Sequence, residues 1–290
     1  MRRRGLLRQV LSTTVGKIGV ALALILAGTS VLVLLTLPLD FGPTRWSNPS
    51  VWADYPKAVP PAWTATLSGG GVVEHEVLEA TEPTASTERG EARVDIYDLS
   101  FEYEADEPPT FLSFSLAEVS YLDRPPSLSV TLLRPDGTSV PLLRTTIRGP
   151  RAGEEPPYER HMETPLRVLV TAEAETAQAA SQMLAEAYGL EIPASRIEDD
   201  VPAALFGAPG PTGELEPLHG EYTAQVRMAL AQPEDTVGWV RVVVGGTVYG
   251  LLGTDGSGRD LAQGLAFGLP VALLIGIAAA TVSTALGTGL

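Results

Sequence analysis

Two long stretches without charged residues lie near the two ends of the chain. The first covers residues 18–39 and has 22 residues, and the second covers residues 261–290 and has 30. A helix rises about 1.5 Å per residue, so about 20 apolar residues cross a hydrocarbon core about 30 Å thick. The pattern therefore predicts two transmembrane helices. A cleaved signal peptide is the alternative for the first stretch, but its apolar region would be unusually long and no small-residue cleavage site follows Leu39.

The positions of the positive charges predict the topology. Residues 1–39 contain five basic residues and no acidic one, and Lys and Arg are retained on the cytoplasmic side of a span. We expect a multi-pass protein of the cell membrane, with a cytoplasmic N-terminus and residues 40–260 outside the cytoplasm. Because the second stretch runs to Leu290 without a polar residue beyond it, we also expect a truncated reading frame.

Between the two stretches, hydrophobic and polar residues mostly alternate, which is the period of a β-strand. We expect strands within 94–103, 112–116, 222–230 and 237–244, and a hairpin from 128 to 142 around a Pro-Asp-Gly turn. The phase of the first strand changes near Tyr97 and Asp98, which predicts a β-bulge there. Two segments rich in Pro and Glu, 79–90 and 149–157, are expected to be exposed loops.

One segment of the middle region has a helical composition. Residues 172–188 are rich in alanine, follow Thr171 as a candidate N-cap and precede Gly189 as a candidate stop. A second short helix is expected after Pro193. These features together predict α-helical transmembrane spans and an extracytoplasmic mainly-β domain, an immunoglobulin-like β-sandwich in the broad sense with a helical insertion.

The patterns divide the chain into six parts. They are a cytoplasmic basic N-terminus (1–17), transmembrane helix 1 (18–39), a Pro- and Trp-rich connector (40–65), an acidic β-rich domain (66–246), a motif segment (247–260) and transmembrane helix 2 (261–290).

The charge of the chain is concentrated in residues 40–260. This region contains all 35 acidic residues and 15 of the 20 basic ones, so its formal charge is −20. Lys17 and Lys57 are the two lysines, and the chain has no cysteine to form a disulfide. A surface of this kind repels itself in dilute buffer, so we expect a halophilic protein. High-GC codon usage is the alternative explanation for the preference of Arg over Lys.

The sequence predicts no catalytic or cofactor site. His75 lies between Glu74 and Glu76, but neighbouring side chains on a strand point to opposite faces and cannot hold one ion. The Glu and His residues of 159–163 share a face if extended, yet a solvated polar strand explains them better. The chain has no P-loop, no nucleophile elbow and no basic aromatic patch, and the glycines at 69–71 read as a loop. We expect no enzymatic activity, cofactor, metal or nucleic acid.

Residues 249–269 carry the most specific pattern, YGLLGTDGSGRDLAQGLAFGL. Its glycines permit tight turns, and Asp260 is placed to cap the helix that follows. Asp255 and Arg259 are expected to pair near the membrane surface, where a lone charge is costly. An ordinary polar loop with a good cap is the alternative interpretation.

The pattern L-G-T-D-x-x-G-R-D before a hydrophobic span resembles a motif of the C-type permease subunits of ABC importers for dipeptides, oligopeptides and nickel. The residues that match it are Leu252, Gly253, Thr254, Asp255, Gly258, Arg259 and Asp260. The basic N-terminus and the connector also resemble that family. The family usually has a short loop between its first two spans and about six spans in total. The resemblance therefore implies that the β-rich domain is an insertion and that the chain corresponds to an N-terminal part of such a subunit.

This resemblance implies peptide transport by a permease subunit that forms the translocation pathway with a second permease subunit. Two cytoplasmic ABC ATPases would hydrolyse ATP, and an extracytoplasmic substrate-binding protein would deliver the substrate. The seven motif residues are expected to have a structural role at the mouth of the pathway. A membrane-anchored extracellular β-sandwich that binds or senses a ligand, and a non-functional permease fragment, are the alternatives.

We expect the full chain in detergent to melt at a higher temperature in molar KCl than in dilute buffer, because salt screens the repulsion within the acidic domain. Thermal melts followed by circular dichroism measure this. A melting temperature that does not rise would contradict the halophilic interpretation.

Overall fold

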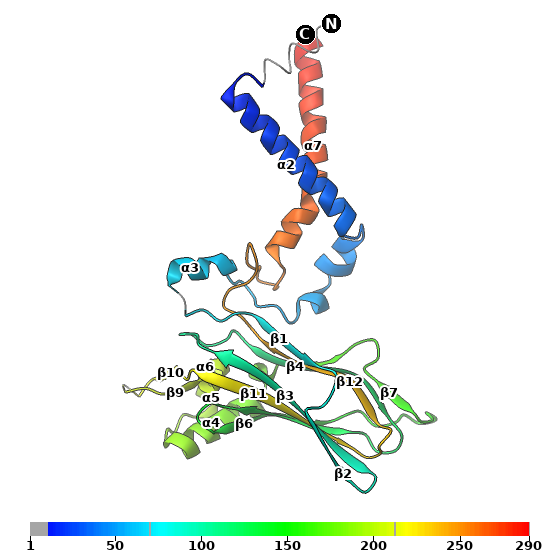
Figure 1. Cartoon of the computed structure of the whole chain (residues 1–290), viewed down its shortest axis with the longest axis vertical. Helices are drawn as coiled ribbons and strands as arrows, with labels where there is room; N and C mark the ends of the chain where they lie inside the picture. Colours follow the sequence, from blue (N-terminus) through cyan, green and yellow to red (C-terminus); the bar gives the residue numbers. More distant parts are fainter. Residues whose placement is uncertain (1–10, 70, 212, 290) are drawn as a thin grey trace.

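The computed structural model describes residues 11–69, 71–211 and 213–289, in which two long helices stand on a β domain (Figure 1). The long helices are α2 (Thr14–Thr36) and α7 (Leu261–Gly289), and both are long and apolar enough to cross a membrane. The predicted span 18–39 is therefore helical as far as Thr36, and the predicted span 261–290 is helical over its described residues. Within the predicted N-terminal part, residues 1–10 lie outside the described residues.

Local signals explain the ends of α2 and the shape of α7. The hydroxyl of Thr13 accepts a hydrogen bond from the Gly16 N–H at 3.1 Å and caps α2, which ends shortly before Pro38. Pro270 lies inside α7, which bends along its length in Figure 1. A proline inside a helix removes one backbone hydrogen bond and bends the helix. The two helices contact each other, and Ser30 and Val33 of α2 are buried.

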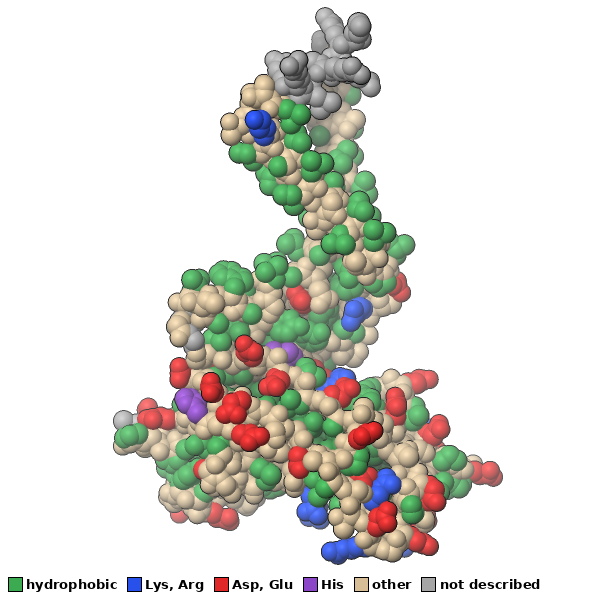
Figure 2. Space-filling view, in the orientation of Figure 1, with side chains coloured by type: hydrophobic (Ala, Val, Ile, Leu, Met, Phe, Trp, Pro, Cys, Tyr) green, Lys and Arg blue, Asp and Glu red, His purple; other side chains and the backbone are tan. Residues whose placement is uncertain are grey.

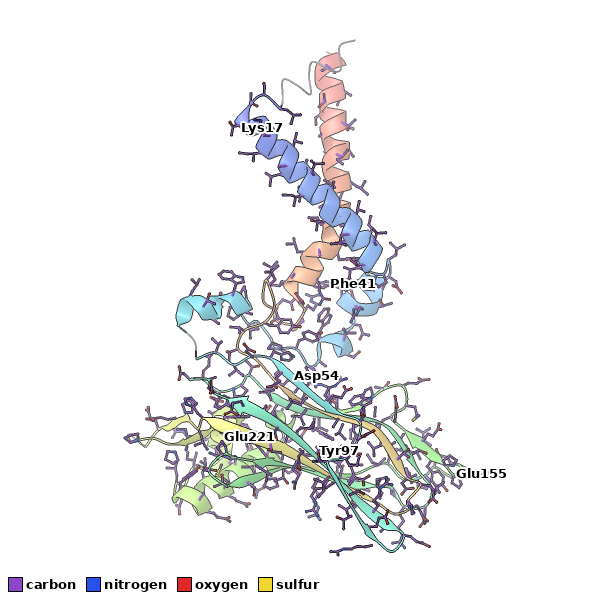
Figure 3. The ribbon with its side chains drawn as sticks, viewed as in Figure 1. Lys17, Phe41, Asp54, Tyr97, Glu155 and Glu221 are labelled. Atoms are coloured by element: carbon purple, nitrogen blue, oxygen red, sulfur yellow. The ribbon has the colours of Figure 1, made fainter. Side chains whose placement is uncertain are left out.

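Two antiparallel five-stranded sheets form the β domain. The first contains β1 (Glu76–Ala80), β12 (Thr236–Val244), β4 (Leu112–Tyr121) and β7 (Tyr158–Arg160) in that order, with β8 (Leu166–Val168) also paired to β4. The second contains β2 (Ala85–Arg89), β3 (Ala92–Tyr103), β11 (Gly220–Leu230), β5 (Ser127–Leu133) and β6 (Ser139–Thr146). Both sheets contribute to one hydrophobic core, in which Tyr97 of β3 lies near the middle (Figure 3). The mainly-β domain is thus confirmed.

The predicted hairpin is confirmed, whereas the predicted bulge is wrong. Strands β5 and β6 form the hairpin, and the Asp136 carboxylate accepts the Thr138 N–H in its turn at 2.9 Å. Strand β3 pairs with β11 without a register shift, and its inward phase runs from Tyr103 through Tyr97 to Asp95. Asp95 is buried because Ser86 donates to it at 2.6 Å and Arg93 pairs with it at 3.0 Å. The sequence pattern of β3 is misleading because a charged residue, Asp95, occupies a buried position in a regular strand.

The predicted loops are partly correct. Residues 149–157 have no helix or strand, as predicted. Within 79–90, however, Ala85–Arg89 forms the edge strand β2, although all five of its residues are exposed. Pairing with the long strand β3 stabilises this polar segment, and its composition alone does not indicate that pairing.

A helical insertion lies between β8 and β11. It contains η4 (Val170–Ala172), α4 (Ala174–Tyr188), α5 (Ala194–Ile197), α6 (Val201–Phe206) and the small strands β9 (Gly207–Pro209) and β10 (Leu215–Pro217). Helix α4 ends at Gly189, whose φ of 68° is left-handed, and α5 follows Pro193, both as predicted. The predicted cap is wrong: α4 begins after Glu173, and the Thr171 hydroxyl is within 3.3 Å of the Leu112 N–H. Tertiary contact with β4 thus takes the hydroxyl away from the helix end.

The connector contains short helices that lead from the two long helices to the β domain. They are η1 (Gly42–Trp46), η2 (Pro49–Trp52) and η3 (Ala62–Thr64), and η3 continues into α3 (Ala65–Ser68). Figure 3 shows Phe41 at the end near the long helices and Asp54 beside the β domain. The connector therefore bridges the two parts of the molecule.

Candidate functional site

The motif segment lies beneath α7, and the connector runs alongside it (Figure 1). Four backbone hydrogen bonds join the two segments: Tyr249 N to Pro60 O (2.9 Å), Ala62 N to Gly250 O (2.9 Å), Thr254 N to Val59 O (3.0 Å) and Ala58 N to Asp255 O (2.9 Å). We call this arrangement, formed by residues 56–63 and 249–255, the joint. It brings together the segments that precede and follow the β domain.

Gly253 and Thr254 allow the closest approach in the joint. Gly253 has a left-handed φ of 74°, and a Cβ at this position would lie 2.3 Å from the Val59 carbonyl oxygen. Thr254 is buried, and its hydroxyl donates to the Pro56 carbonyl at 2.7 Å and accepts the Val59 N–H at 3.3 Å. Position 253 therefore requires a glycine, and position 254 requires a short side chain with a hydroxyl group.

Asp255 and Arg259 form the predicted ion pair. Their side chains are 2.7 Å apart, and the Asp255 carboxylate also accepts the backbone N–H groups of Ser257 at 2.9 Å and Arg259 at 3.0 Å. The guanidinium carbon of Arg259 lies 4.6 Å from the centre of the Trp46 ring, which is a cation–π distance. Gly258 permits the turn between the two charges with a φ of 80°. The pair closes a compact loop against the connector.

Asp260 caps α7, as the sequence predicts. Its carboxylate accepts the Ala262 N–H at 2.8 Å, the Gln263 N–H at 3.3 Å and the Gln263 side-chain amide at 3.1 Å. A carboxylate in this position satisfies free N–H groups and interacts favourably with the helix dipole. The start of α7 is therefore fixed by the last residue of the motif.

Aromatic side chains continue from α7 through the connector to the β domain. The ring pairs are Phe41–Phe267 (5.0 Å), Trp46–Trp52 (6.0 Å), Trp52–Tyr55 (5.2 Å), Tyr55–Tyr249 (5.2 Å) and His75–Tyr249 (5.3 Å). Gly264 of α7 makes room for this cluster, because a Cβ there would lie 2.3 Å from the Trp46 ring. The high density of aromatic residues in the connector was the sequence signal for this cluster, but the partner of each ring could not be predicted.

An ion pair fixes the connector to the first sheet. The Asp54 carboxylate accepts hydrogen bonds from Arg167 of β8 at 2.7 Å and from Ser113 of β4 at 2.8 Å. Arg167 also donates to the Ala53 carbonyl at 2.5 Å. No local sequence pattern indicates this contact, because the three residues lie far apart along the chain.

The structure shows the surroundings of the histidines that the sequence pattern drew attention to, His75 and His161. No group of three or more His, Asp or Glu side chains in residues 11–69, 71–211 and 213–289 is arranged to hold a metal ion. Strand β7 ends at Arg160, and His161 has a φ of 58°, so 159–163 is not one extended face. Burial lowers the pKa of His75 despite the opposing charge of Asp54, so the buried site favours the neutral imidazole. His75 thus serves as an aromatic member of the cluster.

A cleft of about 530 Å³ opens between the connector and the outer face of the first sheet. Six of the side chains that line it are Tyr55, His75, Arg167, Trp239, Arg241 and Tyr249. Arg241 lies 4.5 Å from the centre of the Trp239 ring and pairs with Glu79 at 2.5 Å. The cleft therefore offers aromatic faces and two arginines, Arg167 and Arg241, that are each paired with a carboxylate.

The chain matches no known protein-family model, and no curated protein is significantly similar to it. The main evidence on function is therefore the geometry of the motif residues. It unites six of the seven residues of the pattern at the foot of α7, and Leu252 lies among them with its side chain partly exposed.

Replacing Gly253 with alanine should lower the melting temperature, because the new Cβ meets the Val59 carbonyl and the left-handed φ costs about 1–3 kcal/mol in a non-glycine residue. Gly256 provides a matched control in the same loop, since its φ is not left-handed and no atom lies within 4 Å of its Cβ position. Thermal melts of the full chain in detergent compare the two variants. Equal melting temperatures for Gly253→Ala and Gly256→Ala would contradict the joint.

The stabilisation from Asp255 should depend on pH. Burial alone raises the pKa of this carboxyl, but hydrogen bonds from the Arg259 side chain and from backbone N–H groups lower it overall below 3.8. Ionised Asp255 therefore stabilises the fold above the unfolded-state pKa of about 4, and this contribution is lost as the pH falls further.

The melting-temperature difference between the wild type and Asp255→Asn should therefore be largest near neutral pH and shrink below about pH 4. Asp123→Asn removes the same charge at an exposed site, where the carboxylate is 64% exposed, and should cause little change at any pH. A difference for Asp255→Asn that does not change between pH 7 and pH 3 would exclude this role.

Proposed function

We propose that the protein is a permease subunit of an ABC importer and carries its β domain as an insertion between the first two transmembrane helices. The observation that supports this proposal is the L-G-T-D-x-x-G-R-D pattern at the start of α7. Its residues supply the cap, the ion pair, the tight turns and the buried threonine of one structural unit. A simple membrane anchor requires none of these features.

In this proposal, α2 and α7 form part of the translocation pathway together with a second permease subunit. Their side chains are mostly exposed, which suits helices that pack against further spans. Two cytoplasmic ABC ATPases hydrolyse ATP, and the helices rock between outward-open and inward-open states. The joint makes the start of α7 and the β domain move as one unit.

The proposal places the N-terminus in the cytoplasm and residues 40–260 outside, in the cell membrane of a halophilic organism. The β domain, which we regard as immunoglobulin-like in the broad sense, then lies where an extracytoplasmic substrate-binding protein docks. Its size and position suit docking or shielding of that protein. Peptides are the substrate class that the resemblance favours.

The cleft above the first sheet favours one alternative, a membrane-anchored extracellular domain that binds or senses a ligand by itself. Aromatic and arginine side chains line this cleft next to the joint, so a ligand there would contact both parts of the molecule. In that case the two helices are anchors, and no ATPase is required.

Purification of the tagged protein from its native membranes in mild detergent distinguishes the two functions. We expect a second permease and ABC ATPase subunits to co-purify, as identified by mass spectrometry. Arg259→Ala removes the ion pair and the contact with Trp46, so it should reduce the recovered ATPase. Arg144→Ala, which changes an exposed arginine of β6, is the control. Recovery of the wild-type protein without any ATPase would contradict the transport function.

A further inference from the structure

A group of exposed apolar side chains lies beside the joint. Its members are Trp63 (52% exposed), Leu67 (78%), Leu251 (68%) and Leu252 (36%), and we call them the interfacial patch. Trp63 and Leu67 belong to the η3–α3 segment, whereas the two leucines belong to the motif segment. Figure 2 shows hydrophobic side chains gathered over the α3 region, above a β domain whose surface carries many acidic side chains.

The segments that form the interfacial patch are depleted in charge. Residues 58–73 and 242–254 contain no charged residue, although residues 40–260 contain all 35 acidic residues of the chain. A single exposed leucine is common on protein surfaces, but a cluster of large apolar residues marks an interaction site. This surface therefore differs from the rest of the acidic domain in a way that water solubility does not explain.

The two segments of the interfacial patch form one unit. The Trp63 indole N–H donates to the Leu251 carbonyl at 3.0 Å, and the Ala62 N–H donates to the Gly250 carbonyl at 2.9 Å. Figure 1 shows α3 at about the height of the first turn of α7. The interfacial patch thus lies where a bilayer crossed by α7 has its surface.

We propose that the interfacial patch inserts into the outer leaflet of the membrane that α2 and α7 cross. Trp63 lies at the level of the lipid headgroups, as tryptophans at membrane surfaces do, and Leu67 and Leu251 enter the upper part of the acyl chains. Lipid is the occupant because the interfacial patch is continuous with the start of α7 and carries no charge. The inference rests on the membrane-spanning part of the proposed function and does not depend on transport.

This contact gives the β domain a third attachment to the membrane, in addition to the two helices. Two helix ends alone leave the domain free to tilt about the line that joins them. A third contact to one side of that line restricts the tilt. The interfacial patch would thereby hold the β domain and its cleft at a defined height above the bilayer.

The absence of cysteine from the chain makes a site-specific test simple. Single variants Leu67→Cys and Leu251→Cys of the full chain are labelled with the fluorophore NBD and reconstituted into phosphatidylcholine vesicles. A lipid with a doxyl quencher on the upper acyl chain is then added to half of the vesicles. Met162→Cys is the matched control, since Met162 is apolar and 48% exposed near β7. Leu274→Cys in α7 reports whether the helix is in the membrane.

We expect the doxyl lipid to quench the labels at 67, 251 and 274 several-fold more strongly than the label at 162. Quenching at 274 but not at 67 and 251 would overturn the interfacial patch and leave the membrane-spanning helices intact. Absence of quenching at 274 would overturn both the interfacial patch and the proposed function. Labels at 67 and 251 that are shielded from aqueous iodide but not quenched by the doxyl lipid would indicate contact with a second copy of the chain, which also contradicts the proposal.

Discussion

The backbone hydrogen bonds between the connector and the motif segment hold together the two chain segments that link the long helices to the β domain. A domain can connect two helices that contact each other only if its entry and exit lie close together. Here Val73 and Thr247 are hydrogen-bonded to each other at the edge of the β domain, at 3.0 Å. The joint then continues this pairing to the helix ends. The entry and the exit of the β domain therefore lie side by side below the two long helices.

Charge is distributed unevenly between the β domain and the segments next to the long helices. The acidic side chains are concentrated on the β domain, whereas the segments of the interfacial patch are uncharged (Figure 2). Charged groups near a membrane surface lose part of their hydration, so they are expensive unless they are paired. Asp255 and Arg259 meet this requirement within one loop, and Asp260 meets it at the end of α7. In the described residues, the charged groups of the motif segment are thus paired or cap a helix, and the acidic side chains gather on the β domain.

This arrangement has a consequence for function. Because the β domain is held at the joint, at the Asp54 ion pair and by the aromatic cluster, it cannot rotate freely on a flexible linker. A transporter that rocks its helices would move the domain together with the start of α7. A binding domain with the same base would instead keep its cleft at a constant distance from the membrane.

Short-range features of this chain follow directly from its sequence. The two apolar helices, the β5–β6 hairpin, the Asp260 cap and the Asp255–Arg259 pair each depend on residues within one hairpin or a few turns. Long-range contacts decided the rest. Asp95 is buried although it is charged, so the hydrophobic pattern did not reveal the inward phase of β3. The Thr171 hydroxyl accepts a hydrogen bond from the Leu112 N–H and does not cap the helix. The joint, the His75 cluster and the cleft exist only because distant segments meet, and such meetings leave no local pattern in the sequence.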